Sequence, residues 1–315
     1  MSASLPDVSE YPLPTLQQYL AGKAAKMPGG PAPYAVPMDR AIIERLSRST
    51  LQYPVDRLVD LAVQVLLSPL LLNSIPVASR SFPRLNELRV QAAGTLGIPV
   101  PDLYAGQLGV PVGAIFTVGT DEQSFIFVET TYEHLAKREE MLFVIGHECG
   151  HIHNHHVTYR TLAFVLLEGG KSAALKREHP TMKAVADALE LFVGTALAAW
   201  SRRAELTADR AGLICCRDLE TSQRALVRLA LGWASERDVE IDDYIRTMRD
   251  TPLSGAARFA LMEESHPVIP IRLQALQLFH DSELYHEMTG LPRPDRTLLA
   301  REELEARVGE LVALV

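Results

Sequence analysis

One segment, EEMLFVIGHECGHIHNHH, constrains the fold of this chain more than any other. Its apolar stretch Met141–Ile145 predicts a buried helix, and His147 and His151 continue that helix four residues apart. This spacing separates two side chains by about 40° around a helix axis and about 6 Å along it, so both imidazoles face the same side. Two imidazoles and the carboxylate of Glu148 are costly to bury without a partner. A metal ion bound to this helix would supply that partner.

Glu148 follows the first histidine and is turned about 100° around the helix axis from it. Its carboxylate is therefore expected beside the open coordination position of the metal, where it can take a proton from bound water. The competing interpretation is a helix that carries two histidines by chance, because short motifs also occur without their function.

A second segment, AWSRRAELTADRAG, offers the third ligand that a catalytic zinc site requires. Glu205 and Asp209 are four residues apart and share a helix face, so Glu205 can reach the metal while Asp209 reaches the free N–H of a ligand histidine. Arg203 is interpreted either as an ion-pair partner of these two acids or as a plain surface arginine. The competing interpretation is a solvated acid pair balanced by the neighbouring residues Arg202, Arg203 and Arg210.

HECGH followed by SRRAELTADRAG and then by SHPVIPIRLQAL resembles the gluzincin metallopeptidases of the HtpX heat-shock-protease and CAAX-prenyl-protease type. The similarity runs from about Leu85 to Phe279. It implies one zinc ion per chain held by the three residues His147, His151 and Glu205, with Glu148 as the base and Asp209 as a supporting carboxylate. It also implies that His266 lies near the developing oxyanion of the substrate; the alternative is a histidine at a helix start, packed by Pro267.

The pattern of apolar residues predicts an α+β fold that is mainly α-helical, with one small β-sheet. The resemblance to gluzincins implies a zincin-like peptidase domain with this sheet beside the HExxH helix. The segments GAIFTVG and SFIFVETT, separated by Thr-Asp-Glu-Gln, predict a hairpin or meander of short strands. We expect a Pro-rich arm and helical subdomain over 1–84, the peptidase domain over 85–280 and a helical tail over 281–315. Helices are predicted over about Asp39–Leu51, Val55–Leu67, Asn86–Leu96, Glu133–Val157, Tyr159–Leu167, Thr181–Leu213, Glu220–Gly232, Ile241–Arg249, Pro252–Glu263, Pro270–Leu278 and Arg301–Leu314.

The expected substrate is a peptide or unfolded protein lying along an exposed strand edge. Family members usually carry Asn-Ala before this strand, where the present chain has Val112-Gly113-Ala114. The alternative function is a zinc-binding module that is catalytically silent or autoinhibited, with the Pro-rich arm in the cleft. Cys149 is expected to pack behind its helix, whereas His153, His155 and His156 are expected at the surface.

Composition excludes some partners and indicates a compartment. A net charge of −8 and a pI near 5.7 argue against a nucleic-acid partner. Three cysteines cannot form a disulfide framework, and no signal peptide is visible, which together favour the cytoplasm. We expect no integral membrane insertion, because charges interrupt every long apolar stretch. A homodimer burying an apolar face of the segment between the two motifs, and weak attachment to a membrane surface, are left open.

Overall fold

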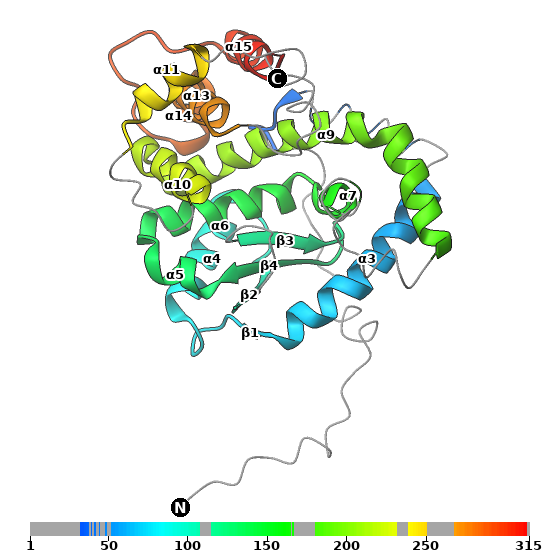
Figure 1. Ribbon diagram of the computed structural model, residues 1–315. Helices are drawn as coiled ribbons and strands as arrows, with labels where there is room; N and C mark the ends of the chain where they lie inside the picture. The colour runs from blue at the N-terminus through cyan, green and yellow to red at the C-terminus, as the bar shows by residue number, and fades with distance from the viewer. Residues whose placement is uncertain are drawn as a thin grey trace, which may run out of the picture.

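The structure is a computed structural model, and its helices and strands confirm the predicted fold class: mainly helical, with one small mixed sheet (Figure 1). The residues that it describes are 32–37, 39, 41, 44, 48, 52–107, 115–164, 166, 180–231, 239–250 and 268–313.

The sheet has four strands in the order β1-β2-β4-β3. β1 (Ser74–Pro76) and β3 (Ile115–Gly119) are the outer strands, while β2 (Asp102–Gly106) and β4 (Ser124–Glu129) are the inner ones. β3 and β4 form the predicted antiparallel hairpin, and β2 runs parallel to β4. The sequence pattern did not reveal β1, because it is only three residues long and ends in a proline, which suits an edge strand.

The two faces of the sheet belong to two different hydrophobic clusters. One face, with Leu103 and Ile126, packs with α4 (Pro83–Leu96) and α6 (Arg138–His153). The opposite face carries the aromatic rings of Tyr104, Phe116 and Phe127, which pack with α3 (Gln52–Leu72) and α7 (Val157–Ala163). Because side chains alternate along a strand, Thr117 points to the α6 face while its neighbours point to the other. The sheet thereby presents one hydroxyl to the helix that carries HECGH.

α6 lies between the sheet and the long helix α9 (Pro180–Cys216), as Figure 1 shows. Glycines let these two helices approach closely. A Cβ atom on Gly150 would lie 2.6 Å from the Ala211 Cβ, and one on Gly146 would lie 2.8 Å from the Cys215 Cβ. On α9, a Cβ on Gly212 would lie 2.7 Å from the Phe143 carbonyl oxygen. The close contact brings the histidines of α6 to the acids of α9.

The remaining helices surround this centre. α5 (Thr130–Leu135) follows β4, and α10 (Leu219–Leu231), α11 (Ile241–Asp250), α13 (Ile269–His280), α14 (Glu283–Thr289) and α15 (Arg301–Ala313) gather around the C-terminal part of α9, away from the sheet (Figure 1). The seven-residue α14 was not predicted. The helix expected over Pro252–Glu263 lies outside the described residues.

The prediction of one helix over Glu133–Val157 was wrong. The chain is extended at Ala136 and Lys137, and α6 starts after this break. The buried Glu140 side chain accepts a hydrogen bond from the Lys137 backbone N–H at 3.0 Å and one from Arg228 Nε of α10 at 3.1 Å. The contact between Glu140 and Arg228 is tertiary and stabilises the new helix start. The periodicity of apolar residues therefore could not predict this break.

The described part of the N-terminal arm packs into the protein. Ala32, Tyr34 and Val36 are buried in the same cluster as α6 and α9. The backbone N–H of Val36 donates to Thr207 Oγ1 of α9 at 3.1 Å. This segment therefore contributes to the core beside the two motif helices.

Across the described part of the chain, no helix is both long enough and apolar enough to cross a membrane.

Candidate metal centre

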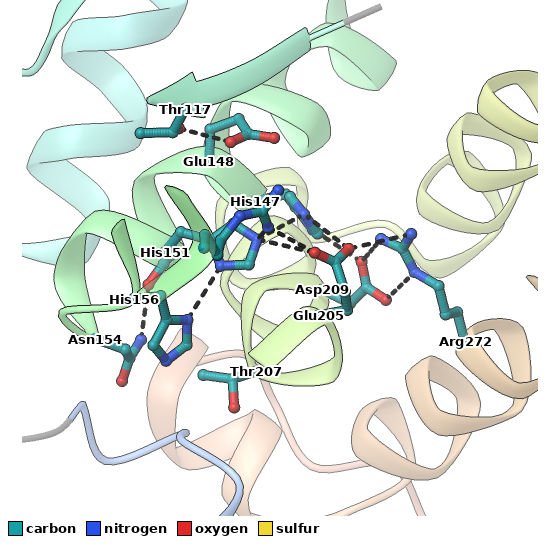
Figure 2. A network of polar contacts seen from close by, with 12 residues as sticks. Thr117, His147, Glu148, His151, Asn154, His156, Glu205, Thr207, Asp209 and Arg272 are labelled. Carbon is teal, nitrogen blue, oxygen red and sulfur yellow. Dashed lines mark hydrogen bonds and ion pairs between the residues drawn. The ribbon is translucent and has the colours of Figure 1, made fainter. Parts of the chain in front are cut away.

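Three donor groups from two helices converge on one point. His147 and His151 project from α6, and Glu205 projects from α9 (Figure 2). The two Nε2 atoms are 3.1 Å apart, and Glu205 carboxylate oxygens lie 3.5 Å from His147 Nε2 and 3.4 Å from His151 Nε2. Donors placed about 2.0–2.2 Å from one tetrahedral zinc ion are about 3.3–3.6 Å from each other. The spacing of the three groups therefore fits a zinc ion, and all three are buried.

His147 is held from behind by Asp209. Its Nδ1 lies 2.9 Å from Asp209 Oδ1, so Nε2 faces the other donors. Burial by itself lowers the pKa of His147, but the hydrogen bonds with Asp209 and Glu205 outweigh it and raise the pKa to about 9. Both contacts come from the i, i+4 acid pair of α9, as the spacing of the two acids suggested.

Arg272 of α13 binds Asp209 with two hydrogen bonds. Nε donates to Oδ2 at 2.8 Å and Nη2 donates to Oδ1 at 2.7 Å, while Nη1 lies 3.3 Å from Glu205 Oε2 (Figure 2). Burial raises the pKa of the Asp209 carboxyl, but the charge and hydrogen bonds of Arg272 outweigh burial, so the pKa is lowered. Arg272 thus keeps this carboxylate ionised and correctly oriented towards His147.

A second guanidinium approaches the donors from α7. Arg160 Nη1 lies 2.5 Å from Glu205 Oε1 and also contacts His151 Nε2. Burial, followed by the Arg160 charge, holds the pKa of His151 well below its usual value. His151 Nε2 has a single lone pair, so its contact with Arg160 would have to break for this nitrogen to bind a metal, whereas the Glu205 carboxylate could contact both groups.

His151 is backed by another histidine. Its Nδ1 lies 3.0 Å from His156 Nδ1, and His156 Nε2 lies 2.9 Å from Asp39 Oδ2. His156 is 2% exposed, so its expected place at the surface was wrong. The tight turn after α6, with His155 at a φ of 56°, folds His156 back under His151.

Glu148 lies on the sheet side of α6. Thr117 Oγ1 of β3 donates a hydrogen bond to Glu148 Oε2 at 2.6 Å, and both side chains are buried (Figure 2). A short hydrogen bond to a carboxylate is among the stronger kinds in proteins. The edge strand and the candidate base are thereby joined directly.

Other predicted site residues have different outcomes. Arg203 donates to the Ala199 carbonyl oxygen at 2.7 Å, and among the described residues it forms no ion pair with Glu205 or Asp209. Arg272 takes that position. His266, like Val112-Gly113-Ala114, lies outside the described residues.

Sequence reasoning assigned no role to Arg272, Thr117, Arg160 or His156. Arg272 belongs to the third motif, SHPVIPIRLQAL, which was the one available signal for it. The contacts of Thr117 and Arg160 depend on how helices and strands pack, and that of His156 depends on the turn after α6, so no helical or strand periodicity indicates them. Cys149 is fully buried, as expected for a residue on the far side of α6.

Comparison with known proteins agrees with this geometry. The model of peptidase family M48 matches residues 80–279. A relative, the plastoglobule-localized metallopeptidase 48 of Arabidopsis thaliana, is 29% identical over 221 residues, which cover 68% of this chain and 61% of the relative. The chain thus spans less than two thirds of that relative's length. No solved structure matches significantly. Because the family match covers well over half of the chain, including both motif helices and Arg272, the chain belongs to peptidase family M48, and the resemblance to gluzincin metallopeptidases is confirmed.

Proposed function

We propose that the protein is a zinc-dependent endopeptidase that hydrolyses peptide bonds in extended or unfolded polypeptides. The observation that carries this proposal is the convergence of His147, His151 and Glu205 at zinc-ligand spacing, with Glu148 next to the first ligand. One zinc ion per chain would be held by these three side chains. Membership of a metallopeptidase family supports the same reading.

When bound, zinc supplies a Lewis acid for the scissile carbonyl and lowers the pKa of water towards neutrality. Glu148 then takes the proton of the attacking water and passes it to the leaving amine nitrogen. Thr117 orients the Glu148 carboxylate through its hydrogen bond to Oε2. Asp209 and Arg272 hold the His147 ring in place. His266 remains our candidate for the group that stabilises the oxyanion.

Strand β3 supports an extended substrate. It is an outer strand of the sheet, and its residue Thr117 contacts the candidate base. An extended peptide can add to such an edge through main-chain hydrogen bonds, which places a peptide bond beside Glu148 without selecting a particular side chain. Folded proteins cannot offer an extended segment in this way.

The location and the assembly are also proposals. We place the protein in the cytoplasm, because Cys149, Cys215 and Cys216 are free thiols and two of them are buried. The Arabidopsis relative is named for its location in chloroplast plastoglobules. A homodimer through the segment between the motifs stays a prediction.

The alternative is a zinc-binding module on the same scaffold that cleaves nothing. The observation in its favour is Arg160, whose guanidinium contacts two of the donor groups. The intact Glu148, oriented by Thr117, argues for catalysis.

The deciding test compares wild type with Glu148→Gln on casein, a disordered protein. We expect both to contain one zinc ion, but only the wild type to cleave casein, and a chelator to stop cleavage because it removes the metal. A Glu205→Ala variant should lose zinc. Wild-type protein that holds zinc and leaves casein intact would favour the silent module, and Glu205→Ala with full zinc content would show that the third ligand is wrong.

A further inference from the structure

A buried chain of polar groups runs from His151 to the N-terminal arm. His151 Nδ1 contacts His156 Nδ1, and His156 Nε2 contacts Asp39 Oδ2. Figure 2 shows His156 directly beneath His151, on the side away from Glu205. Asp39 is 2% exposed and lies before residue 80, where the family match begins. This chain of polar groups therefore connects His151, a ligand of the metal centre, to Asp39, a residue that the family match does not include.

Asp39 is held by two further donors. Trp200 Nε1 donates to Oδ1 at 2.7 Å, and Thr207 Oγ1 donates to Oδ2 at 2.8 Å. Thr207 in turn accepts the Val36 backbone N–H. Asp39 thus accepts three hydrogen bonds in a buried position, which fix the orientation of its carboxylate. Such an arrangement is costly to build, and packing alone does not require it.

The Asp39 carboxylate determines which group donates in each hydrogen bond between Asp39, His156 and His151. An ionised carboxylate only accepts, so His156 Nε2 must carry a proton. A neutral imidazole has one donor and one acceptor, so His156 Nδ1 accepts the proton of His151 Nδ1. His151 Nε2 is then left with its lone pair, and this is the atom that faces His147 and Glu205. Asp39 therefore selects the tautomer of His151 that can bind a metal.

We propose that Asp39 and His156 are positioning residues of the metal centre, which hold His151 in its metal-binding tautomer and orientation. This inference rests on the proposed zinc site. It gives His151 the same kind of support that Asp209 gives His147, with His156 inserted as a relay because the carboxylate is one ring further away. The segment around Asp39 then supports the metal centre directly.

Asp39→Asn tests these hydrogen-bond directions, because asparagine has almost the same shape as aspartate but offers a donor in place of one acceptor. Trp200 Nε1 can only donate, so the amide oxygen of the new side chain must occupy the Oδ1 position, and its NH2 group then faces His156 Nε2. That nitrogen becomes an acceptor, both imidazoles invert, and the proton of His151 moves to Nε2, where zinc has to bind. We expect zinc affinity, measured by chelator competition, to fall by about 10- to 100-fold.

The matched control is Asp218→Asn, which makes the same chemical change at the start of α10, where Asp218 Oδ1 accepts the Thr221 N–H. It should bind zinc as the wild type does. Circular dichroism and thermal unfolding of each variant report whether the fold is retained. Retained fold with zinc affinity within about threefold of wild type in Asp39→Asn would overturn the inference, because loss of a supporting group changes affinity by more than that.

A pair of His156 variants tests the relay if Asp39→Asn does not fold. His156→Gln keeps an acceptor for His151 and a donor for Asp39, so it should retain zinc affinity within about threefold. His156→Leu has a similar size but neither group, and its zinc affinity should fall by about 10- to 100-fold. If His156 had only a structural role, His156→Leu would not bind zinc more weakly than His156→Gln, since leucine suits a buried site better than glutamine. Equal affinities would therefore refute the relay.

Failure of the inference and failure of the proposed function give different results. Wild-type protein that binds no zinc would refute the proposed function. Wild type that binds zinc, alongside unaffected Asp39→Asn and His156→Leu variants, would refute only the positioning role.

Discussion

Thr117 illustrates how one residue can link the sheet to the chemistry of the site. It is flanked on β3 by Phe116 and Val118, whose side chains pack on the opposite face of the sheet with the aromatic cluster. Its hydroxyl therefore faces α6 and donates to Glu148 Oε2 at 2.6 Å, with Thr117 only 6% exposed. A valine would fit the strand equally well, so the hydroxyl serves the carboxylate.

Thr117→Val should lower kcat and destabilise the protein, while leaving zinc content nearly unchanged. The variant keeps the shape of the side chain but loses a hydrogen bond to a charged group, worth about 1.5–3 kcal/mol. If about half of that acts in the transition state, kcat falls by about 4- to 13-fold. Steady-state cleavage of a fluorogenic peptide measures the effect, and Thr117→Ser, which keeps the hydroxyl, should restore most of it. Unchanged kcat in Thr117→Val would remove Thr117 from the mechanism.

At the scale of elements, the site depends on how closely α6 and α9 approach. Both ligand histidines are on one helix, whereas Glu205 and Asp209 are on the other. Small residues at the crossing, Gly150 on α6 and Ala208 and Ala211 on α9, permit the distance at which an imidazole and a carboxylate can share a metal ion. The separation between the two helices therefore determines the separation between ligands.

Gly150→Ala should weaken both the fold and the metal site. The added Cβ would lie 2.6 Å from the Ala211 Cβ and 3.1 Å from the Ala208 Cα, so the helices must move apart. Overpacking of this kind costs about 1–3 kcal/mol. We expect a lower denaturation midpoint together with weaker zinc binding.

The control for Gly150→Ala is Gly94→Ala in α4, where no atom beyond the neighbouring residues and backbone of its own helix lies within 4 Å of the new Cβ. It should stabilise the protein by about 0.4–1 kcal/mol, because alanine reduces the conformational freedom of the unfolded chain. Equal stability changes in the two variants would show that the helix crossing is not close-packed.

Across the whole molecule, Arg210 of α9 connects three distant parts of the chain. Its guanidinium donates twice to the Glu305 carboxylate of α15, at 2.8 and 3.1 Å, and once to the Tyr34 carbonyl oxygen of the N-terminal arm. It also lies 5.2 Å from the centre of the Phe279 ring of α13. Because the Arg210 side chain is only 3% exposed, loss of its anion would leave a buried charge unpaired.

Glu305→Gln should therefore destabilise the protein by about 1.5–3 kcal/mol, the value of hydrogen bonds to a charged group. Urea unfolding followed by circular dichroism measures the loss. Glu310→Gln, on the exposed side of the same helix, removes the same charge and should change stability by less than about 0.5 kcal/mol. Similar values for the two variants would mean that α15 is not tied to α9 through Arg210. Zinc content should be unaffected in both.

The sequence by itself determined the parts of this protein that depend on local geometry. The helical periodicity and the four-residue spacings in HECGH and AELTAD placed His147 beside His151 and Glu205 beside Asp209, because residues four apart on any helix share a face. The same periodicity predicted most helices and the β3–β4 hairpin. It failed at Ala136-Lys137, where Glu140 and Arg228 divide one expected helix into two.

Only the tertiary structure decided what surrounds the ligands. Arg272 reaches Asp209 across 63 residues of sequence, and Asp39 meets Trp200 across 161. His156 is buried because a tight turn folds it back beneath His151, although a run of four histidines in six residues is typical of a solvated surface. Spacing along the chain says nothing about such pairs, since the packing of α6, α9 and the sheet sets which distant side chains come within hydrogen-bonding distance.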